Sequence, residues 1–78
     1  MGLKVTVIVE KDGHGYYAYC PQLSGCHSQG DTFEDVMRNI REAIELYVET
    51  MDKEEKRMLL SGDVYTAQVE VPFDAEVA

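Results

Sequence analysis

The sequence predicts a small α+β domain whose elements follow the order β-β-β-α-β. Hydrophobic and polar residues alternate near both ends of the chain, which is the period-two pattern of half-buried strands. Between these segments apolar residues recur at three- and four-residue spacing, as in an amphipathic helix. A chain of 78 residues has room for one hydrophobic core. We therefore expect one domain over residues 1–78, with an ordered core from about residue 3 to residue 73.

The N-terminal part of the chain predicts a β-hairpin. One face of the first strand carries Leu3, Val5, Val7 and Val9. Asp12-Gly13 and Gly15 then supply the positive-φ positions that a chain reversal needs. The segment Tyr16 to Cys20 is rich in strand-forming tyrosine and is predicted to be the second strand.

A third strand and a helix start are predicted next. Pro21 cannot donate a ladder hydrogen bond, so it ends the second strand or places it at an edge, and Gly25 offers another bend. Cys26 to Gln29 then forms the third strand. Thr32 is a helix-capping residue, and Asp35, three positions later, is placed to reach back to the cap.

The central helix is predicted to run for about five turns with one continuous apolar face. This face consists of Phe33, Val36, Met37, Ile40, Ala43, Ile44, Tyr47, Val48 and Met51. The charged residues between them form a solvated face. The charge run from Asp52 to Arg57 either extends the helix or forms a loop, and Ser61-Gly62-Asp63 ends whatever precedes it.

A fourth strand is predicted after this break. Its apolar positions are Tyr65, Ala67, Val69 and Val71, and Pro72 stops it. The helix is long enough for a right-handed crossover that would place this strand parallel to the first at the sheet edge. The last residues, from Asp74 to Ala78, are expected to fray. Because one helix covers only one face, the other face must be polar or covered by another molecule.

The charge balance limits the kinds of partner that the protein can bind. Fifteen acidic residues against seven basic ones give a net charge of −8, which repels phosphate backbones. We therefore expect no direct nucleic-acid binding and a basic protein as the better-matched partner. No apolar run at the start has the length of a signal peptide or membrane span, so we expect a cytoplasmic protein with no membrane association and two reduced cysteines.

The residues that could bind a metal or take part in catalysis do not form a recognisable active site. Cys20, Cys26, His14 and His27 lack the tight pairs of a structural zinc site. A Cys26 nucleophile would need an adjacent histidine and an oxyanion site. The carboxylates that could suggest nuclease chemistry lie mostly at turns, where Asp is common: Glu10, Asp12, Asp31 and Asp63. We expect no catalytic residue, no metal and no cofactor, and hence no enzyme.

The segment from Gly15 to Asp35 identifies a family resemblance. Its sequence, G-Y-Y-A-Y-C-P-Q-L-S-G-C-H-S-Q-G-D-T-F-E-D, followed by Asn39 and Glu42-Ala43-Ile44, resembles the HicB-like antitoxin domain. The match covers about Val5 to Glu49 by motif and the last strand by pattern. Ser24 stands where the family often has proline. Many HicB proteins continue into a DNA-binding segment, whereas this sequence ends soon after the fourth strand, as a stand-alone domain would.

The resemblance implies a truncated ribonuclease-H-like sheet with one helix packed on one face. It also implies a toxin-antitoxin role, in which the domain masks a small basic HicA-type toxin that cleaves RNA. Exposed tyrosines on a rigid strand are typical interface residues. We therefore expect the partner to bind at the aromatic strand and the bend after it, through Tyr17, Tyr19, Pro21, Gln22 and Leu23. The alternative is a self-assembling domain with an unknown ligand or regulatory role, and we expect a homodimer or homotetramer in either case.

Overall fold

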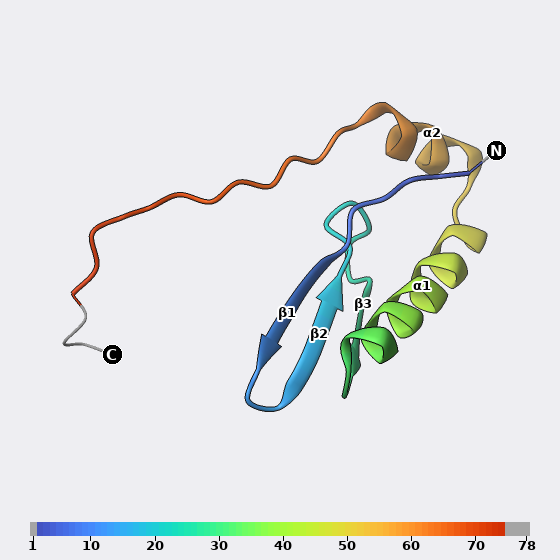
Figure 1. Cartoon of the computed structure of the whole chain (residues 1–78). Helices are drawn as coiled ribbons and strands as arrows, with labels where there is room; N and C mark the ends of the chain where they lie inside the picture. Colours follow the sequence, from blue (N-terminus) through green and yellow to red (C-terminus); the bar gives the residue numbers. More distant parts are fainter. Residues whose placement is uncertain (1, 75–78) are drawn as a thin grey trace.

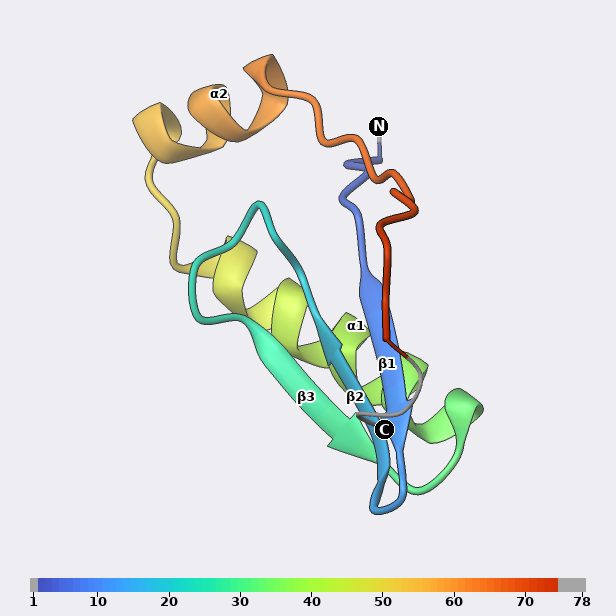
Figure 2. The same cartoon turned by 90° about the vertical axis from the view of Figure 1, so that its left-hand side faces the viewer.

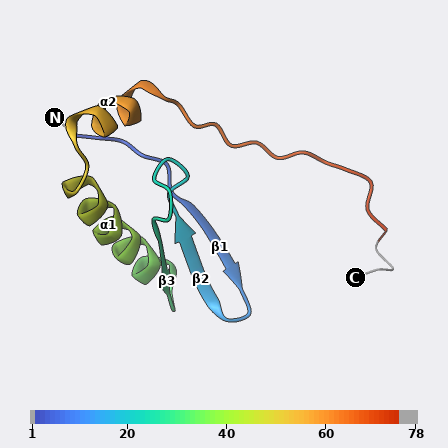
Figure 3. The ribbon, with the colours of Figure 1, turned by 180° about the vertical axis from the view of Figure 1, so that it is seen from behind.

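The computed structural model of the chain describes residues 2–74. A three-stranded antiparallel sheet contains β1 (Ile8–Asp12), β2 (Gly15–Tyr19) and β3 (His27–Gly30), with β2 in the middle. Two helices follow, α1 (Phe33–Glu49) and α2 (Lys53–Ser61) (Figure 1). Helix α1 packs on β3 and β2 from one side, and within residues 2–74 no helix covers the other side of the sheet (Figure 3). The α+β class is therefore confirmed.

The predicted hairpin is confirmed, and its turn has a clear local cause. The Oδ1 atom of Asp12 accepts a hydrogen bond from the His14 backbone N–H at 2.7 Å. Gly15 follows with a φ of 134°, a value that residues with a side chain rarely adopt. This turn fixes the register, so that Val9 lies opposite Ala18, and Ala18 lies opposite Ser28 on β3.

The core lies between the sheet and α1. Its buried residues within the described chain are Ala18, Cys20, Leu23, Cys26, Val36 and Ile40. The predicted cap is present, because Thr32 Oγ1 accepts a hydrogen bond from the Asp35 N–H at 3.0 Å. The Asp35 carboxylate does not reach back to the cap but pairs with Arg38 at 2.8 Å. At Gly30 the sheet backbone comes so close to α1 that there is no room for a side chain.

The charge run after α1 forms a second helix, α2. Thr50 ends α1, and Asp52 begins α2 by accepting a hydrogen bond from the Glu55 N–H at 2.8 Å. An acidic cap followed by acids in the first turn favours a new helix start over continuation of the first helix. None of the helices in residues 2–74 is long and apolar enough to cross a membrane.

The predicted fourth strand is wrong for this structure. Residues 62–74 form no strand, and they leave α2 as an extended segment beyond the free edge of β1 (Figures 1 and 2). Tyr65 is 88% exposed and Val69 is 81% exposed, so the alternating residues meet no sheet. The order is consequently β-β-β-α-α, and the ribonuclease-H-like arrangement is not confirmed. Of the end expected to fray, residues 75–78 lie outside the described residues.

Candidate partner-binding surface

The register divides the strand residues between two faces. Ala18 and Cys20 are buried beneath α1, and Tyr16 makes an edge-on contact with Phe33 of that helix. Because side chains alternate along a strand, Tyr17 and Tyr19 lie on the opposite face, which we call the open face. The open face also carries Ile8, Glu10, His27 and Gln29, which pair with these tyrosines across the sheet.

An aromatic group forms the centre of the open face. The rings of Tyr17 and His27 are stacked, with centroids 5.7 Å apart, although the two residues lie on different strands. The rings of Tyr17 and Tyr19 lie 5.9 Å apart along β2. Tyr17 remains 37% exposed. Mutual contact holds these side chains in fixed positions, which lowers the entropy cost of using them in an interface.

The loop that follows β2 is closed on itself. The Cys20 N–H donates to the Cys26 carbonyl at 3.1 Å, and the Leu23 N–H donates to the Cys20 carbonyl at 3.1 Å. Leu23 is only 2% exposed, so its side chain anchors this loop in the core. Gln22 Oε1 accepts a hydrogen bond from the Thr6 N–H at 2.6 Å and so ties the loop to the chain before β1.

The structure brings most of the predicted partner-binding residues together. A shallow hollow of about 240 Å³ beside the aromatic group is lined by Tyr17, Tyr19, Pro21, Leu23 and His27, among others. Gln22 instead faces Thr6. His27 is the residue that sequence reasoning missed, because we considered it only as a metal ligand. Its stacking on Tyr17 follows from the β2–β3 register, which the sequence does not show.

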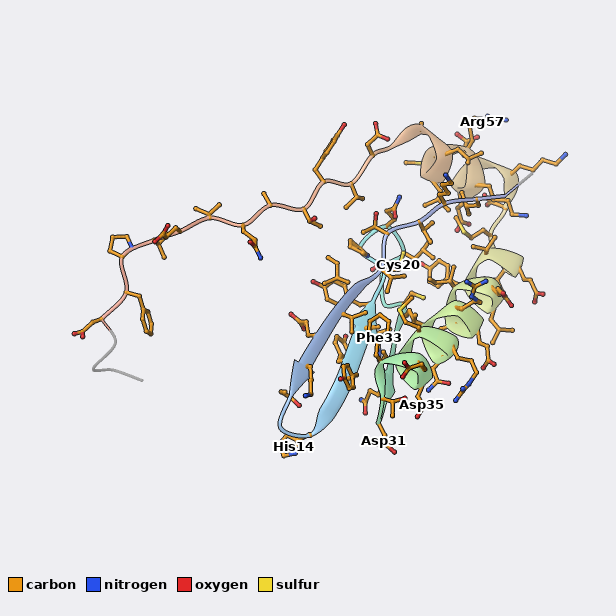
Figure 4. All side chains as sticks on the ribbon, in the orientation of Figure 1. His14, Cys20, Asp31, Phe33, Asp35 and Arg57 are labelled. Atoms are coloured by element: carbon orange, nitrogen blue, oxygen red, sulfur yellow. The ribbon has the colours of Figure 1, made fainter. Side chains whose placement is uncertain are left out.

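The thiol and imidazole groups are separated in space. Figure 4 shows His14 at the hairpin turn and Cys20 beyond the far end of β2. His27 is on the open face, whereas Cys20 and Cys26 are buried. Burial raises the pKa of the Cys26 thiol, and the neighbouring Cys20 raises it further. A neutral buried thiol is a packing group rather than a nucleophile.

Carboxylates outnumber basic side chains on α1 but not on α2. Helix α1 carries five acidic residues and two arginines, whereas α2 carries three basic residues and two acidic ones. Exposed carboxylates on the two helices belong to Glu34, Glu42, Glu45, Glu49, Glu54 and Glu55. Among residues 2–74, His, Cys, Asp and Glu side chains form no group of three or more that could hold a metal ion. The net charge of −8 is thus spread over the protein rather than confined to the helices, while the open face offers aromatic contact area.

These features define a small acidic α+β binding domain with an aromatic sheet face. The family model described as "HicB_like antitoxin of bacterial toxin-antitoxin system" matches residues 5–76. The chain therefore belongs to the HicB-like antitoxin family, which supports an antitoxin role and a toxin partner, and points to regulation by binding rather than to catalysis.

Several relatives are similar to this chain over much of its length. A UPF0150 protein of Helicobacter pylori is 41% identical over 88% of this chain and 96% of its own length. A UPF0150 protein of Archaeoglobus fulgidus is 41% identical over 86% of this chain and 91% of its own. A UPF0150 protein of Synechocystis sp. is 65% identical, and there the match spans 59% of this chain and 60% of the relative. No solved structure matches the chain.

Proposed function

We propose that this protein is an antitoxin that masks a small basic HicA-type, RNA-cleaving toxin by protein–protein contact through the open face. Tyr17, Tyr19 and His27 supply the desolvated contacts, and Pro21 borders them. Leu23 and Gln22 hold the loop in place from behind. The observation that carries the proposal is the exposed aromatic group on a sheet face that no helix covers. Aromatic residues in fixed positions are the usual anchors of protein interfaces.

The net negative charge of the protein adds electrostatic steering to this contact. A net charge of −8 attracts a basic partner over about one Debye length, roughly 8 Å at physiological ionic strength. The same charge disfavours RNA binding to the antitoxin, so the basic toxin can release its RNA and bind the antitoxin instead. We place this exchange in the cytoplasm, where the toxin would meet its RNA.

If a short basic protein is encoded beside this chain, binding to that protein tests the proposal. We expect Tyr17→Ala and Tyr19→Ala each to weaken the complex by about 1 to 3 kcal/mol, roughly 5- to 150-fold in Kd, mainly through faster dissociation. Leu46→Ala is the matched control, because Leu46 is an apolar residue that is 64% exposed on α1. Glu10→Gln, at the rim of the open face, should mostly lower the association rate.

Thermal melting must accompany each binding measurement. Both tyrosines lie on the face away from the core, so their alanine variants should melt close to the parent while binding weakly. If both variants melt like the parent and bind the basic protein as tightly as the parent does, the open face is not the toxin-binding surface. Failure of the parent itself to bind that protein or to inhibit its ribonuclease activity would reject the antitoxin assignment to this partner.

A further inference from the structure

The segment after α2 has the composition of a strand and no strand partner. Its alternate residues Tyr65, Val69 and Val71 are apolar and exposed, and Phe73 continues the exposed apolar series. Within the described chain, residues 64–73 make no hydrogen bond. An extended segment of this kind carries a row of unused backbone donors and acceptors, as an unpaired edge strand does. This segment, which we call the C-terminal arm (residues 64–73), therefore has the composition and the free backbone groups of a strand that pairs with another strand.

The free edge of β1 offers the complementary surface. β1 has β2 on one side, and no strand of the described residues lies on the other. The Thr6 N–H points inward, toward Gln22. Because backbone groups of successive strand residues point to opposite sides, those of Val5, Val7 and Val9 point outward from the sheet. These three valines also pack against the edge of the core, so an added strand would extend both the ladder and the core.

The arm does not pair with the β1 edge of its own chain. A hollow of about 740 Å³ separates Thr6, Val7 and Ile8 from the arm residues Thr66, Ala67 and Gln68. Gly62, between α2 and the arm, has extended backbone angles (φ −103°, ψ 157°), which carry the arm away from the body. The radius of gyration is accordingly 15.6 Å, against about 11.5 Å for a compact chain of this length.

We propose that two copies of this chain exchange their C-terminal arms, each arm pairing with the free β1 edge of the other copy. An arm that projects outward on an extended hinge can meet the same edge on a neighbour, and mutual exchange closes both edges with two-fold symmetry. The apolar arm residues expose about 600 Å² per copy. Two arms therefore offer about 1,200 Å² of apolar surface, which reaches the lower end of the range for stable interfaces before the receiving edges are counted.

The size of the core supports a second copy as the occupant. Six residues are buried within the described chain, which is few for a domain that must fold alone. The arm also carries Glu70 as its only charged residue between Val64 and Phe73, so it adds little repulsion when two acidic copies meet. The exchange uses the sheet edge and leaves Tyr17 and Tyr19 on the open face, so it does not depend on the toxin.

Sedimentation equilibrium of the full chain, without any partner, tests the assembly. We expect a dimer at micromolar concentration and at least about a tenfold weaker dimer for Val69→Lys, which places a charge on the apolar side of the arm. Gln68→Lys introduces the same side chain at the adjacent position, on the other side of the arm, and should change dimerisation less than about threefold. A monomeric parent, or equal effects of the two variants, would overturn the proposal.

Disulfide trapping distinguishes exchange from closure of the arm on its own chain. One copy carries Thr6→Cys and the other Gln68→Cys, and the two are co-expressed with different tags. Both positions lie on the open-face side in the exchanged pairing, and the native cysteines are buried. We expect a mixed disulfide between the copies, or between copies with Ile8→Cys and Gln68→Cys if the register differs by two residues. If neither pair links two copies, the exchange is refuted. This holds even if a single chain that carries both Thr6→Cys and Gln68→Cys forms a disulfide within itself.

Discussion

Replacing Gly30 by alanine is the sharpest test of how the sheet and α1 fit together. A Cβ atom at this position would lie 2.5 Å from the Val36 backbone N and 2.9 Å from its Cα. Ordinary contact begins at 3.4 Å, so the helix backbone would have to move by about 0.9 Å. Both neighbours are backbone atoms, which cannot move aside by changing a rotamer.

The magnitude follows from what moves with the helix. Val36 and Ile40 are the largest fully buried side chains, and both sit on the part of α1 that would be displaced. Forcing a side chain into a packed core costs about 1–3 kcal/mol and occasionally more, so we expect about 3 kcal/mol for Gly30→Ala. In a domain of this size each kcal/mol lowers Tm by about 4–8 °C, which predicts a loss of about 12–24 °C.

Thermal denaturation followed by circular dichroism measures this loss. Gly13→Ala is the control, because a Cβ atom there would meet nothing within 4 Å and Gly13 does not have a positive φ. Its Tm should stay within a few degrees of the parent. If Gly30→Ala melts as the control does, then α1 does not approach β3 as closely as the structure shows, and the reasoning fails.

Two further predictions concern the core. Ile40→Ala should lower the free energy of unfolding in urea by about 2–5 kcal/mol, and Leu46→Ala on the exposed side of the same helix by less than about 0.5 kcal/mol; similar losses would mean that α1 packs on another face. Burial raises the pKa of Cys26, so the unfolded thiol ionises first, and stability should fall as the pH rises above about 8.5. The fall in Tm between pH 7 and pH 10 should therefore be smaller for Cys26→Ala, and an equal fall would show that this thiol does not titrate differently on folding.

The elements that depend on local signals could be predicted from the sequence. The hairpin follows from Asp12-Gly13 and Gly15, and the start of α1 follows from Thr32, because these residues act on backbone groups two or three positions away. The apolar face of α1 was also predictable, since helical spacing identifies it without knowledge of the partner surface.

Features that depend on distant pairing could not be predicted. Alternation in residues 65–71 shows that the segment can line a sheet, but it does not say which edge, or whose, the segment joins. Alternation also places Tyr17 and Tyr19 on the same face without showing which face α1 covers. In the structure Ala18 and Cys20 are buried beneath α1, which places both tyrosines on the other face. The second helix does not follow from the sequence, because a charge run is equally compatible with a loop.

The contact between Gln22 and Thr6 means that a side chain stands in for one rung of the β ladder. Pro21 lies where β2 would continue alongside Thr6, but the Thr6 N–H does not bond to the Pro21 carbonyl. Gln22 supplies an oxygen at 2.6 Å from the Thr6 nitrogen instead, across sixteen residues of sequence. One amide side chain therefore holds the chain before β1 in its position. A Gln22→Leu variant would keep the bulk but lose the acceptor, and would release the chain before β1 from this loop while the hairpin turn keeps β1 and β2 in register.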